Sequence, residues 1–526
     1  MRSFWHRFVA RLQEHPEALL ALASFWLSTL PLWFWMLLDP RAYRSEMWPG
    51  AILLLVALFL LGWLHPLLYL IAALGVGFLN AAYMHTDHFW RIGDLSVRIE
   101  TTLDSSPGEA QEFFQQFVLR SHFAWGLIAY VLIALALGGL YWWARRQKPR
   151  RFGWATRLGI TLPLVALLIG LGRSLLNAYP AVRLATTTYE VYTRVNRILE
   201  RKDWVARALA EQPTLDCKAP YDHIVFVLGE SANRDFMHAY GFDLPTTPFL
   251  DNLADKVLVR AISPVNQTMT SVPILLTKAT VTDYDPYYTT PSIISDLRRC
   301  GYRTYWFSNQ LRYSPYTSSV SSIASEADVV KFMTEELQLY GEPDEVLLQL
   351  FSPEEILPGQ KQAFFFHLLG SHFEWKKRYP PEKALIPNPQ DFTETYINSI
   401  YYTDQVLAEI FQLFQERSEN LLFIYTSDHG EWITPKQGGH ANAHPFQEEY
   451  RVPLVFWASH PEDLAPIAQA TQGRLVNIET LNLQIRFLVS LEPDPGISYR
   501  TQVLSLGPGR IHDYTELPYV EYHETP

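Results

Sequence analysis

The sequence predicts an α-helical membrane domain followed by an α/β sandwich with a largely parallel central sheet. Apolar runs dominate residues 1–175, whereas apolar strand-like segments alternate with amphipathic segments over residues 219–526. Runs of membrane-spanning length predict the first domain, and the alternation predicts the second. Residues 176–218 between them are mixed and charged, and we expect them to form a helical connector.

The apolar runs predict five transmembrane helices. Residues 18–38 and 123–144 are each long enough for one crossing, which needs about 20 residues. Residues 47–84 are too long for one crossing, so we expect His65-Pro66 to break them into two helices. Residues 155–175 supply the fifth helix, in which Arg157 and Arg173 can reach the membrane interfaces.

Basic residues predict the orientation of these helices. Arg2, Arg7 and Arg11 precede the first helix, and a second basic cluster lies at residues 145–151. Both clusters are expected in the cytoplasm. Five crossings then place the second domain on the opposite side, in the periplasm or outside the cell, together with the loop at residues 85–120.

Composition excludes some partners and some metal sites. The net charge of −11 argues against binding to nucleic acid. Cys217 and Cys300 are the only cysteines, so the chain has neither a disulfide framework nor a cysteine-ligated metal site. These two cysteines could pair in an oxidising compartment, and the sequence leaves that pairing open.

Polar residues stand at the carboxyl ends of the predicted strands, where α/β sheets bind their ligands. A solvated carboxylate or a turn-forming asparagine explains any one of them alone. Together, carboxylates and imidazoles at strand ends predict a metal site. The residues concerned are Glu230 after strand 223–230, Asn309 after strand 302–309, His372 after strand 363–372, and Asp428 and His429 after the strand beginning at residue 421.

A hydroxyl cluster lies between the first two of these strands. Thr268, Thr270 and Ser271 precede Pro273, so we expect them at the start of a helix, where hydroxyls serve as caps. One hydroxyl could instead be a metal-bound nucleophile assisted by the helix dipole. Zinc lowers the pKa of bound water from about 15.7 to about 7, and an alcohol should benefit similarly. These residues alone do not decide which hydroxyl reacts.

Motifs along the chain resemble those of a known family in content and order. The chain resembles the phosphoethanolamine transferases of the bacterial inner membrane, in the alkaline phosphatase/sulfatase superfamily. The stretch 301–310 is more similar to members that modify the lipopolysaccharide core than to the colistin-resistance enzymes that act on lipid A. The motifs are Gly229-Glu-Ser-Ala-Asn-Arg234, Thr268-Met-Thr-Ser-Val-Pro273, Gly301-Tyr-Arg-Thr-Tyr-Trp-Phe-Ser-Asn-Gln310, His367-Leu-Leu-Gly-Ser-His372, Tyr396-Ile-Asn-Ser-Ile-Tyr-Tyr-Thr-Asp404 and Ser427-Asp-His-Gly-Glu431.

The resemblance assigns roles to individual residues. It implies that Thr268 is the nucleophile and that zinc is the cofactor. It also implies substrate contacts, including an anionic partner for the ethanolamine ammonium group in the loop 85–120. The expected zinc ligands are Glu230, Thr268, Asp428 and His429, and the expected substrate-binding residues are His372, His440, Glu109 and Asn309.

The resemblance also implies an activity. We expect phosphoethanolamine to pass from phosphatidylethanolamine to lipopolysaccharide core, lipid A or another envelope acceptor through a covalent phosphoethanolamine-threonine intermediate. The protein is expected to act as a monomer in the inner membrane, with its catalytic domain in the periplasm. The alternatives are a phosphoglycerol transferase of the lipoteichoic-acid-synthase type, another sulfatase-fold phosphodiesterase, or a metal-free, membrane-anchored binding protein.

Two departures from related families bear on these expectations. A sulfatase would need an arginine two residues after Pro273, and Leu275 stands there. The lipid A enzymes have a pair of cysteines that bracket the nucleophile, and those positions are Pro264 and Ile274 here. We therefore expect either that other interactions hold the nucleophile segment or that this segment is looser.

Overall fold

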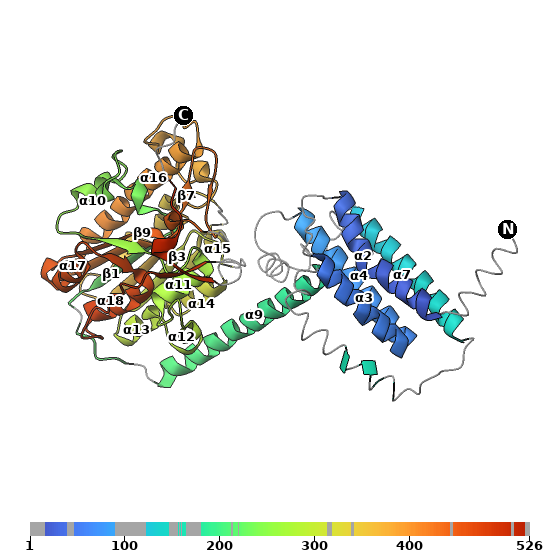
Figure 1. The fold of residues 1–526 in the computed structure, drawn as a ribbon. Helices are drawn as coiled ribbons and strands as arrows, with labels where there is room; N and C mark the ends of the chain where they lie inside the picture. Colours follow the sequence, from blue (N-terminus) through green and yellow to red (C-terminus); the bar gives the residue numbers. More distant parts are fainter. Residues whose placement is uncertain are drawn as a thin grey trace. The chain divides into compact units, whose positions relative to one another are not determined.

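The computed structural model divides into two compact units, Met1–Val195 and Asn196–Pro526, which are described separately (Figure 1). The division falls within helix α9 (Pro180–Glu211), inside the predicted connector 176–218. The predicted domain boundaries stay predictions. The structure describes residues 16–38, 47–89, 122–146, 156, 158, 160, 161, 163, 164, 180–211, 214–218, 220–312, 318–337, 341–441, 445–505 and 510–520.

Apolar helices with buried tyrosines pack together in the first unit. The hydroxyl of Tyr130 donates to Leu27 O at 3.0 Å, and that of Tyr141 donates to Gly62 O at 2.8 Å. His65 separates two consecutive helices, so the predicted break at His65-Pro66 is confirmed. The helices are α2 (Pro16–Leu38), α3 (Met47–Leu64), α4 (Pro66–Phe89) and α7 (His122–Arg146).

The membrane assignment of the first unit stays a prediction. Within the described part of the chain, no helix is both long enough and apolar enough to cross a membrane. The fifth predicted helix, at residues 155–175, and the loop 85–120 lie mostly outside the described residues, and Glu109 is among those not described.

An eight-stranded sheet forms the centre of the second unit, in the order β10-β2-β9-β6-β1-β5-β3-β4. Only β9 runs antiparallel to its neighbours in this sheet. The predicted α/β fold with a largely parallel sheet is therefore confirmed. The strands are β1 (His223–Gly229), β2 (Val257–Ile262), β3 (Arg303–Ser308), β4 (Val329–Phe332), β5 (Gln362–His367), β6 (Leu421–Ser427), β9 (Arg451–Ala458) and β10 (Leu475–Asn477).

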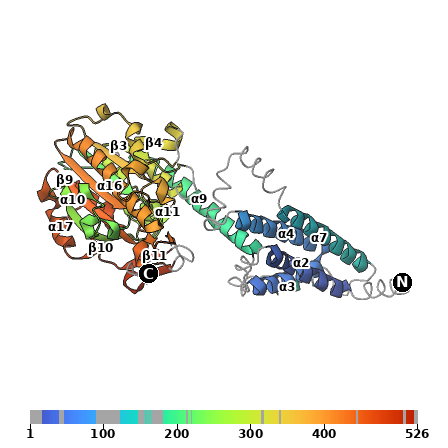
Figure 2. The ribbon, with the colours of Figure 1, turned by 90° about the horizontal axis from the view of Figure 1, so that it is seen from above.

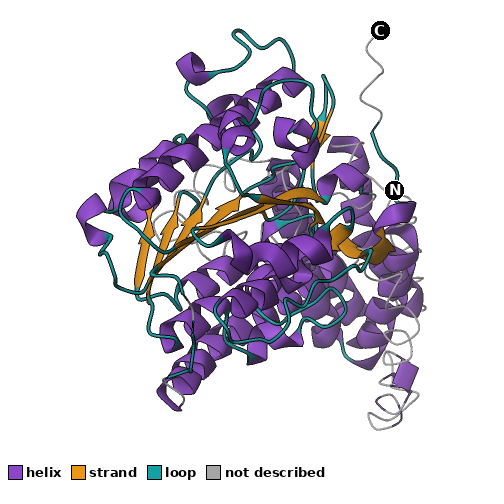
Figure 3. Cartoon of the chain, turned by 90° about the vertical axis from the view of Figure 1, so that its left-hand side faces the viewer, coloured by secondary structure: helices purple, strands orange, loops and turns teal. Residues whose placement is uncertain are grey.

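Helices cover both faces of this sheet (Figure 3). Successive side chains of a strand point to opposite faces, so Ile224 and Phe226 of β1 join one apolar cluster and Val225 joins the other. The first cluster includes side chains of α11 (Thr268–Leu276), α13 (Ile293–Arg299), α14 (Ser318–Ala324), α17 (Ala465–Thr471) and α18 (Leu481–Leu488), and the second includes side chains of α10 (Pro248–Asn252) and α16 (Phe392–Gln415). Helices α10 and α16 lie side by side (Figure 2).

Shorter elements complete the second unit. The remaining helices are α12 (Asp285–Thr289) and α15 (Met333–Glu336), and the two small antiparallel sheets are β7 (Trp432–Ile433) with β8 (Gly438–Gly439) and β11 (Gln502–Ser505) with β12 (Arg510–Asp513).

The end of α9 and the chain that follows it are tied to the second unit. Arg201 is buried, pairs with Glu326 and donates to Tyr287 O at 2.5 Å. Cys217 and Cys300 form a disulfide with a Cα–Cα distance of 5.3 Å. The pairing that the sequence left open is therefore present.

Candidate functional site

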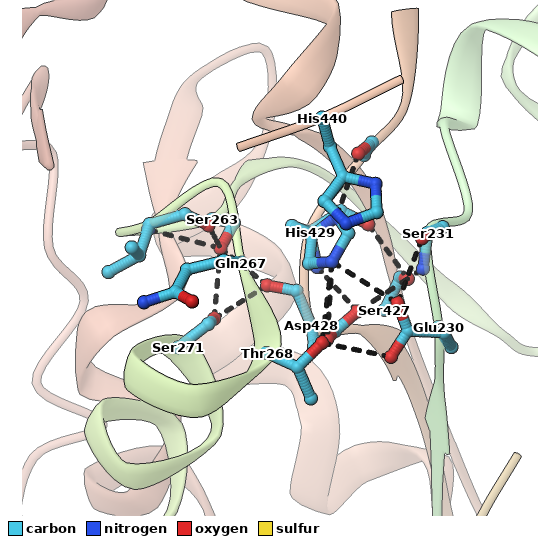
Figure 4. Close-up of polar contacts among 12 residues, drawn as sticks. Glu230, Ser231, Ser263, Gln267, Thr268, Ser271, Ser427, Asp428, His429 and His440 are labelled. Atoms are coloured by element: carbon cyan, nitrogen blue, oxygen red, sulfur yellow. Dashed lines mark hydrogen bonds and ion pairs between the residues drawn. The ribbon is translucent and has the colours of Figure 1, made fainter. Parts of the chain in front are cut away.

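The predicted metal ligands meet where β1 and β6 end (Figure 4). These strands are parallel neighbours, and their register pairs Gly229 with Ser427. Glu230 and Asp428, the next residues along each strand, therefore lie side by side, with His429 after Asp428. All three side chains are buried. The structure thus brings together Glu230, Asp428 and His429, as the sequence predicted.

The distances from His429 Nε2 to three neighbouring oxygen atoms suit ligands of one shared ion. His429 Nε2 lies 3.2 Å from Glu230 Oε1, 3.6 Å from Asp428 Oδ2 and 3.4 Å from Thr268 Oγ1. Thr268 Oγ1 lies 3.0 Å from Glu230 Oε2. Zinc binds nitrogen and oxygen at about 2.0–2.2 Å, so neighbouring ligand atoms of a tetrahedral zinc ion stand about 3.3–3.6 Å apart. The measured separations lie in or close to that range.

Hydrogen bonds orient each ligand toward the centre of the cluster. Asp428 Oδ1 accepts from the backbone N–H groups of His429 at 2.8 Å and Ser231 at 3.2 Å. Its other oxygen, Oδ2, is buried and makes no hydrogen bond with the residues described. His429 Nδ1 lies 2.8 Å from Gly430 O, so Nδ1 is the donor and Nε2 faces the carboxylates. A buried carboxylate oxygen without a donor is the arrangement that a cation satisfies.

The electrostatics of the cluster also favour a cation. Burial, followed by the charge of Glu230, raises the pKa of Asp428 to about 7. Burial opposes protonation of His429, but Asp428 and Glu230 overcome it and raise its pKa to about 10. Burial likewise raises the pKa of Glu230, but the hydrogen bond and charge of His429 bring it well below its usual range. Protons thus compensate the buried negative charge, and a divalent cation would replace them.

Tight backbone packing surrounds these ligands. Ser231 adopts a left-handed conformation with φ 57°, a strained state that places its N–H on Asp428. A Cβ on Gly430 would lie 2.2 Å from Glu448 O, so close approach of the chain explains this glycine. Gly370, with φ +52°, passes so near Glu230 that a Cβ would lie 2.7 Å from Glu230 O. The geometry of the site therefore depends on small residues outside the ligand set.

Helix α11 presents Thr268 at its first residue, which corrects one expectation from the sequence. Pro273 was expected near the helix start, but it lies inside α11, and the cap residue Gln267 forms no side-chain cap. Proline has no N–H, so it cannot donate to the carbonyl four residues earlier, on Met269. The hydroxyl of Ser319 donates to that carbonyl at 2.6 Å instead. Thr268, not Thr270 or Ser271, faces the ligand cluster.

Two hydroxyl groups tie the region of α11 to the segment after β6 that carries the predicted metal ligands. Ser263 and Ser271 donate to Asp428 O at 2.5 and 2.6 Å, and their own oxygens are 3.0 Å apart (Figure 4). The three segments that carry Ser263, Ser271 and Asp428 therefore share one buried acceptor. These bonds hold the segment that carries Thr268, the predicted nucleophile.

Two predicted histidines lie beside the cluster. The ring of His440 is 4.2 Å from the ring of His429 and 6.2 Å from the ring of His372. His440 Nδ1 is 2.7 Å from Oε2 of Glu431, a fully buried carboxylate. His429, Glu431 and His440 form a second group whose ligand atoms are close enough for an ion. We assign His429 to the first group because its Nε2 faces Glu230, Asp428 and Thr268.

Gln310, and not its predicted neighbour Asn309, contacts a residue of the ligand cluster. Asn309 is buried, and its amide nitrogen donates to Glu342 O and to Asp344 Oδ1, both at 2.8 Å. Its predicted contact with substrate stays a prediction. Gln310, for which the sequence suggested no role, donates to Glu230 Oε2 at 2.9 Å. The signal available was its position directly after a strand end. Glu109, the remaining predicted residue, lies outside the part of the chain described.

The fold and this site define the class of the second unit. Residues 222–470 match the family model described as Sulfatase. This part of the second unit is therefore similar to sulfatases, and the resemblance drawn from the motifs is confirmed by relatives named phosphoethanolamine transferases.

Two such relatives come from Escherichia coli K12. Phosphoethanolamine transferase EptC is 30% identical over 272 residues, which are 46% of this chain and 47% of that protein. Phosphoethanolamine transferase OpgE is 27% identical over 296 residues, 53% of this chain and 54% of that protein. The chain spans about half the length of these curated relatives.

One solved structure resembles most of the chain. The integral membrane protein lipooligosaccharide phosphoethanolamine transferase A of Neisseria meningitidis aligns with a TM-score of 0.50 and 16% identity. The alignment covers 90% of this chain and 95% of that structure. At this identity the similarity concerns the fold.

Proposed function

We propose that this protein transfers phosphoethanolamine from phosphatidylethanolamine to a cell-envelope acceptor, lipopolysaccharide or lipid A, through a covalent intermediate on Thr268. The observation that carries the proposal is the position of the Thr268 hydroxyl. It begins α11 and lies within 3.4 Å of both Glu230 and His429. The names of the relatives supply the group that is transferred.

Zinc is the cofactor that fits this donor set. Glu230, Asp428, His429 and Thr268 would hold it, and the buried Oδ2 of Asp428 would gain a partner. Bound zinc would lower the pKa of the nucleophile and stabilise negative charge on the phosphoryl oxygens.

Thr268 and the neighbouring histidines would have different roles in the two steps of the transfer. Thr268 donates its hydroxyl hydrogen toward Glu230 Oε2, so its lone pair is free to attack phosphorus. The new bond joins Thr268 Oγ1 to phosphorus, and the bond from phosphorus to the diacylglycerol oxygen breaks. The diacylglycerol oxygen takes up one proton, which balances the proton that Thr268 loses, and His372 and His440 are the neighbouring side chains that would relay it. An acceptor hydroxyl or phosphate then displaces Thr268 from phosphorus, and the proton that the acceptor loses restores the Thr268 hydroxyl.

A lipid donor requires access to a membrane. We therefore propose that residues 1–175 span the bacterial inner membrane and that the catalytic unit, a monomer, faces the periplasm. The name of the Neisseria protein, an integral membrane protein, supports this arrangement. Glu109 of the loop 85–120 would bind the ammonium group of the donor.

Two measurements test the function. Incubation of the purified chain with phosphatidylethanolamine alone should add one phosphoethanolamine group to the peptide that contains Thr268, detected by mass spectrometry. Lipopolysaccharide from cells that express the protein should carry the same increment, and its fragment position would identify the acceptor. A glycerophosphate adduct formed from phosphatidylglycerol would indicate the phosphoglycerol transferase instead.

A further inference from the structure

Gln310 lies beside the proposed metal site, where it contacts the predicted ligand Glu230. It follows β3, and only 8% of its surface is exposed. Its amide nitrogen donates one hydrogen to Glu230 Oε2 at 2.9 Å and the other to Leu368 O at 3.0 Å. Both hydrogens of the amide are therefore engaged, and the orientation of the group is fixed.

This side chain joins the ends of three parallel strands. The sheet order places β5 between β1 and β3. Gln310 follows β3, Leu368 follows β5 and Glu230 follows β1, so the amide of Gln310 reaches across the end of β5 to the metal ligand. The position of Glu230 thus depends on β3 as well as on its own strand.

The two carboxylate oxygens of Glu230 have different hydrogen-bond partners. Oε1 faces His429 Nε2 and accepts from Ser231 Oγ at 2.8 Å. Oε2 accepts from Thr268 Oγ1 and from Gln310. The Gln310 amide therefore fixes the rotation of the carboxylate, which sets one oxygen on the ligand cluster and the other on the nucleophile.

The chemistry of an amide suits this position. A lysine or arginine would pair with Glu230 and compete with a divalent cation for its charge. An amide N–H group orients the carboxylate but leaves its full negative charge for the metal. Outer partners of this kind typically change metal affinity by about 10- to 100-fold when they are removed.

We propose that Gln310 is a positioning residue for Glu230, which it orients for zinc binding and for contact with Thr268. The inference rests on the proposed zinc site but not on the identity of the transferred group. The proposal gives the residue that follows β3 a role in the metal site, which the sequence of β3 did not predict.

The test compares two buried glutamines of the full chain, purified in detergent. Gln310→Met keeps the size of the side chain and removes the amide. Gln362→Met is the matched control, because Gln362 is also buried and donates to Tyr305 Oη at 3.1 Å and Glu355 O at 2.8 Å. Gln362 begins β5, so it lies at the opposite end of the sheet from the site. Zinc affinity is measured by competition with a chelator, and unfolding of the metal-free protein is measured in parallel.

Gln310→Met should raise the zinc Kd by about 10- to 100-fold, whereas Gln362→Met should leave it unchanged even if the metal-free protein is destabilised. Gln310→Asn, which is one methylene shorter and cannot reach both acceptors, should also weaken zinc binding if Gln310→Met fails to fold. A wild-type Kd in a folded Gln310 variant, or an equal loss in Gln362→Met, overturns the inference. A wild-type protein that binds no zinc overturns the metal site itself, and the inference with it.

Discussion

Replacing Gly370 with alanine should destabilise the catalytic unit, because the backbone of Gly370 lies against that of Glu230. Gly370 has φ +52°, and a Cβ would stand 2.7 Å from Glu230 O and 2.9 Å from Glu230 N. A left-handed conformation costs an L-residue roughly 1–2 kcal/mol. Overpacking against a rigid neighbour typically costs about 1–3 kcal/mol more. The free energy of unfolding should therefore fall by about 2–5 kcal/mol.

Gly359→Ala separates these two contributions. Gly359 also has a positive φ, +72°, but a Cβ there would meet no atom within 4 Å. Its substitution should cost only the conformational part, roughly 1–2 kcal/mol. Urea unfolding followed by tryptophan fluorescence measures both variants, and chelator competition measures their zinc affinity. Gly370→Ala should also weaken zinc binding, because Glu230 is displaced. Equal destabilisation by the two substitutions, with equal zinc affinity, would refute the reasoning.

Other substitutions test the nucleophile, the metal, the helix and a buried carboxyl group. Thr268→Ala should abolish transfer in a folded protein, as measured by the mass of lipopolysaccharide, whereas Thr270→Ala should retain it; the reverse result would exclude Thr268. Asp428→Ala should lower zinc content and transfer together, and activity that survives complete chelation would contradict the metal site. Ser319→Ala should cost about 1–3 kcal/mol in urea unfolding because a buried carbonyl in α11 loses its donor; an unchanged midpoint would contradict this. Burial raises the pKa of Asp404 to about 7, so the stability that its protonated form contributes is complete below the ordinary pKa of about 3.9 and is lost as pH rises through about 7. Asp404→Asn should therefore flatten the fall in the free energy of unfolding between pH 5 and 8. Parallel profiles of unfolding free energy against pH in the variant and the unaltered protein would argue against this.

The sequence predicted those secondary-structure elements that a single local pattern of residues determines. Continuous apolar runs gave β1 and β6 with their polar ends, because a strand buried on both faces leaves little choice of residue. The register of those strands could not be read from the runs, yet it is the register that places Glu230 beside Asp428. The position of Pro273 within α11 was predicted wrongly, because the carbonyl of Met269 that proline leaves without a donor is satisfied by Ser319, a residue 46 positions beyond Pro273. Gln310 was missed for the same reason, since its partners come from β1 and β5.

The hydrogen bonds around Thr268, the proposed nucleophile, hold its segment without the cysteines that bracket the nucleophile in the lipid A enzymes. A disulfide between positions 264 and 274 would constrain only the short loop that carries Thr268. The hydroxyls of Ser263 and Ser271 instead bind Asp428 O, on the strand that supplies the metal ligands. The segment that carries Thr268, the proposed nucleophile, is therefore positioned directly relative to the proposed metal ligands, and not only within its own loop. The single disulfide, Cys217–Cys300, lies elsewhere, where the chain leaves α9 and joins the sheet. The disulfide thus constrains the segment between α9 and β1, whereas the hydrogen bonds to Asp428 O hold the segment that carries Thr268.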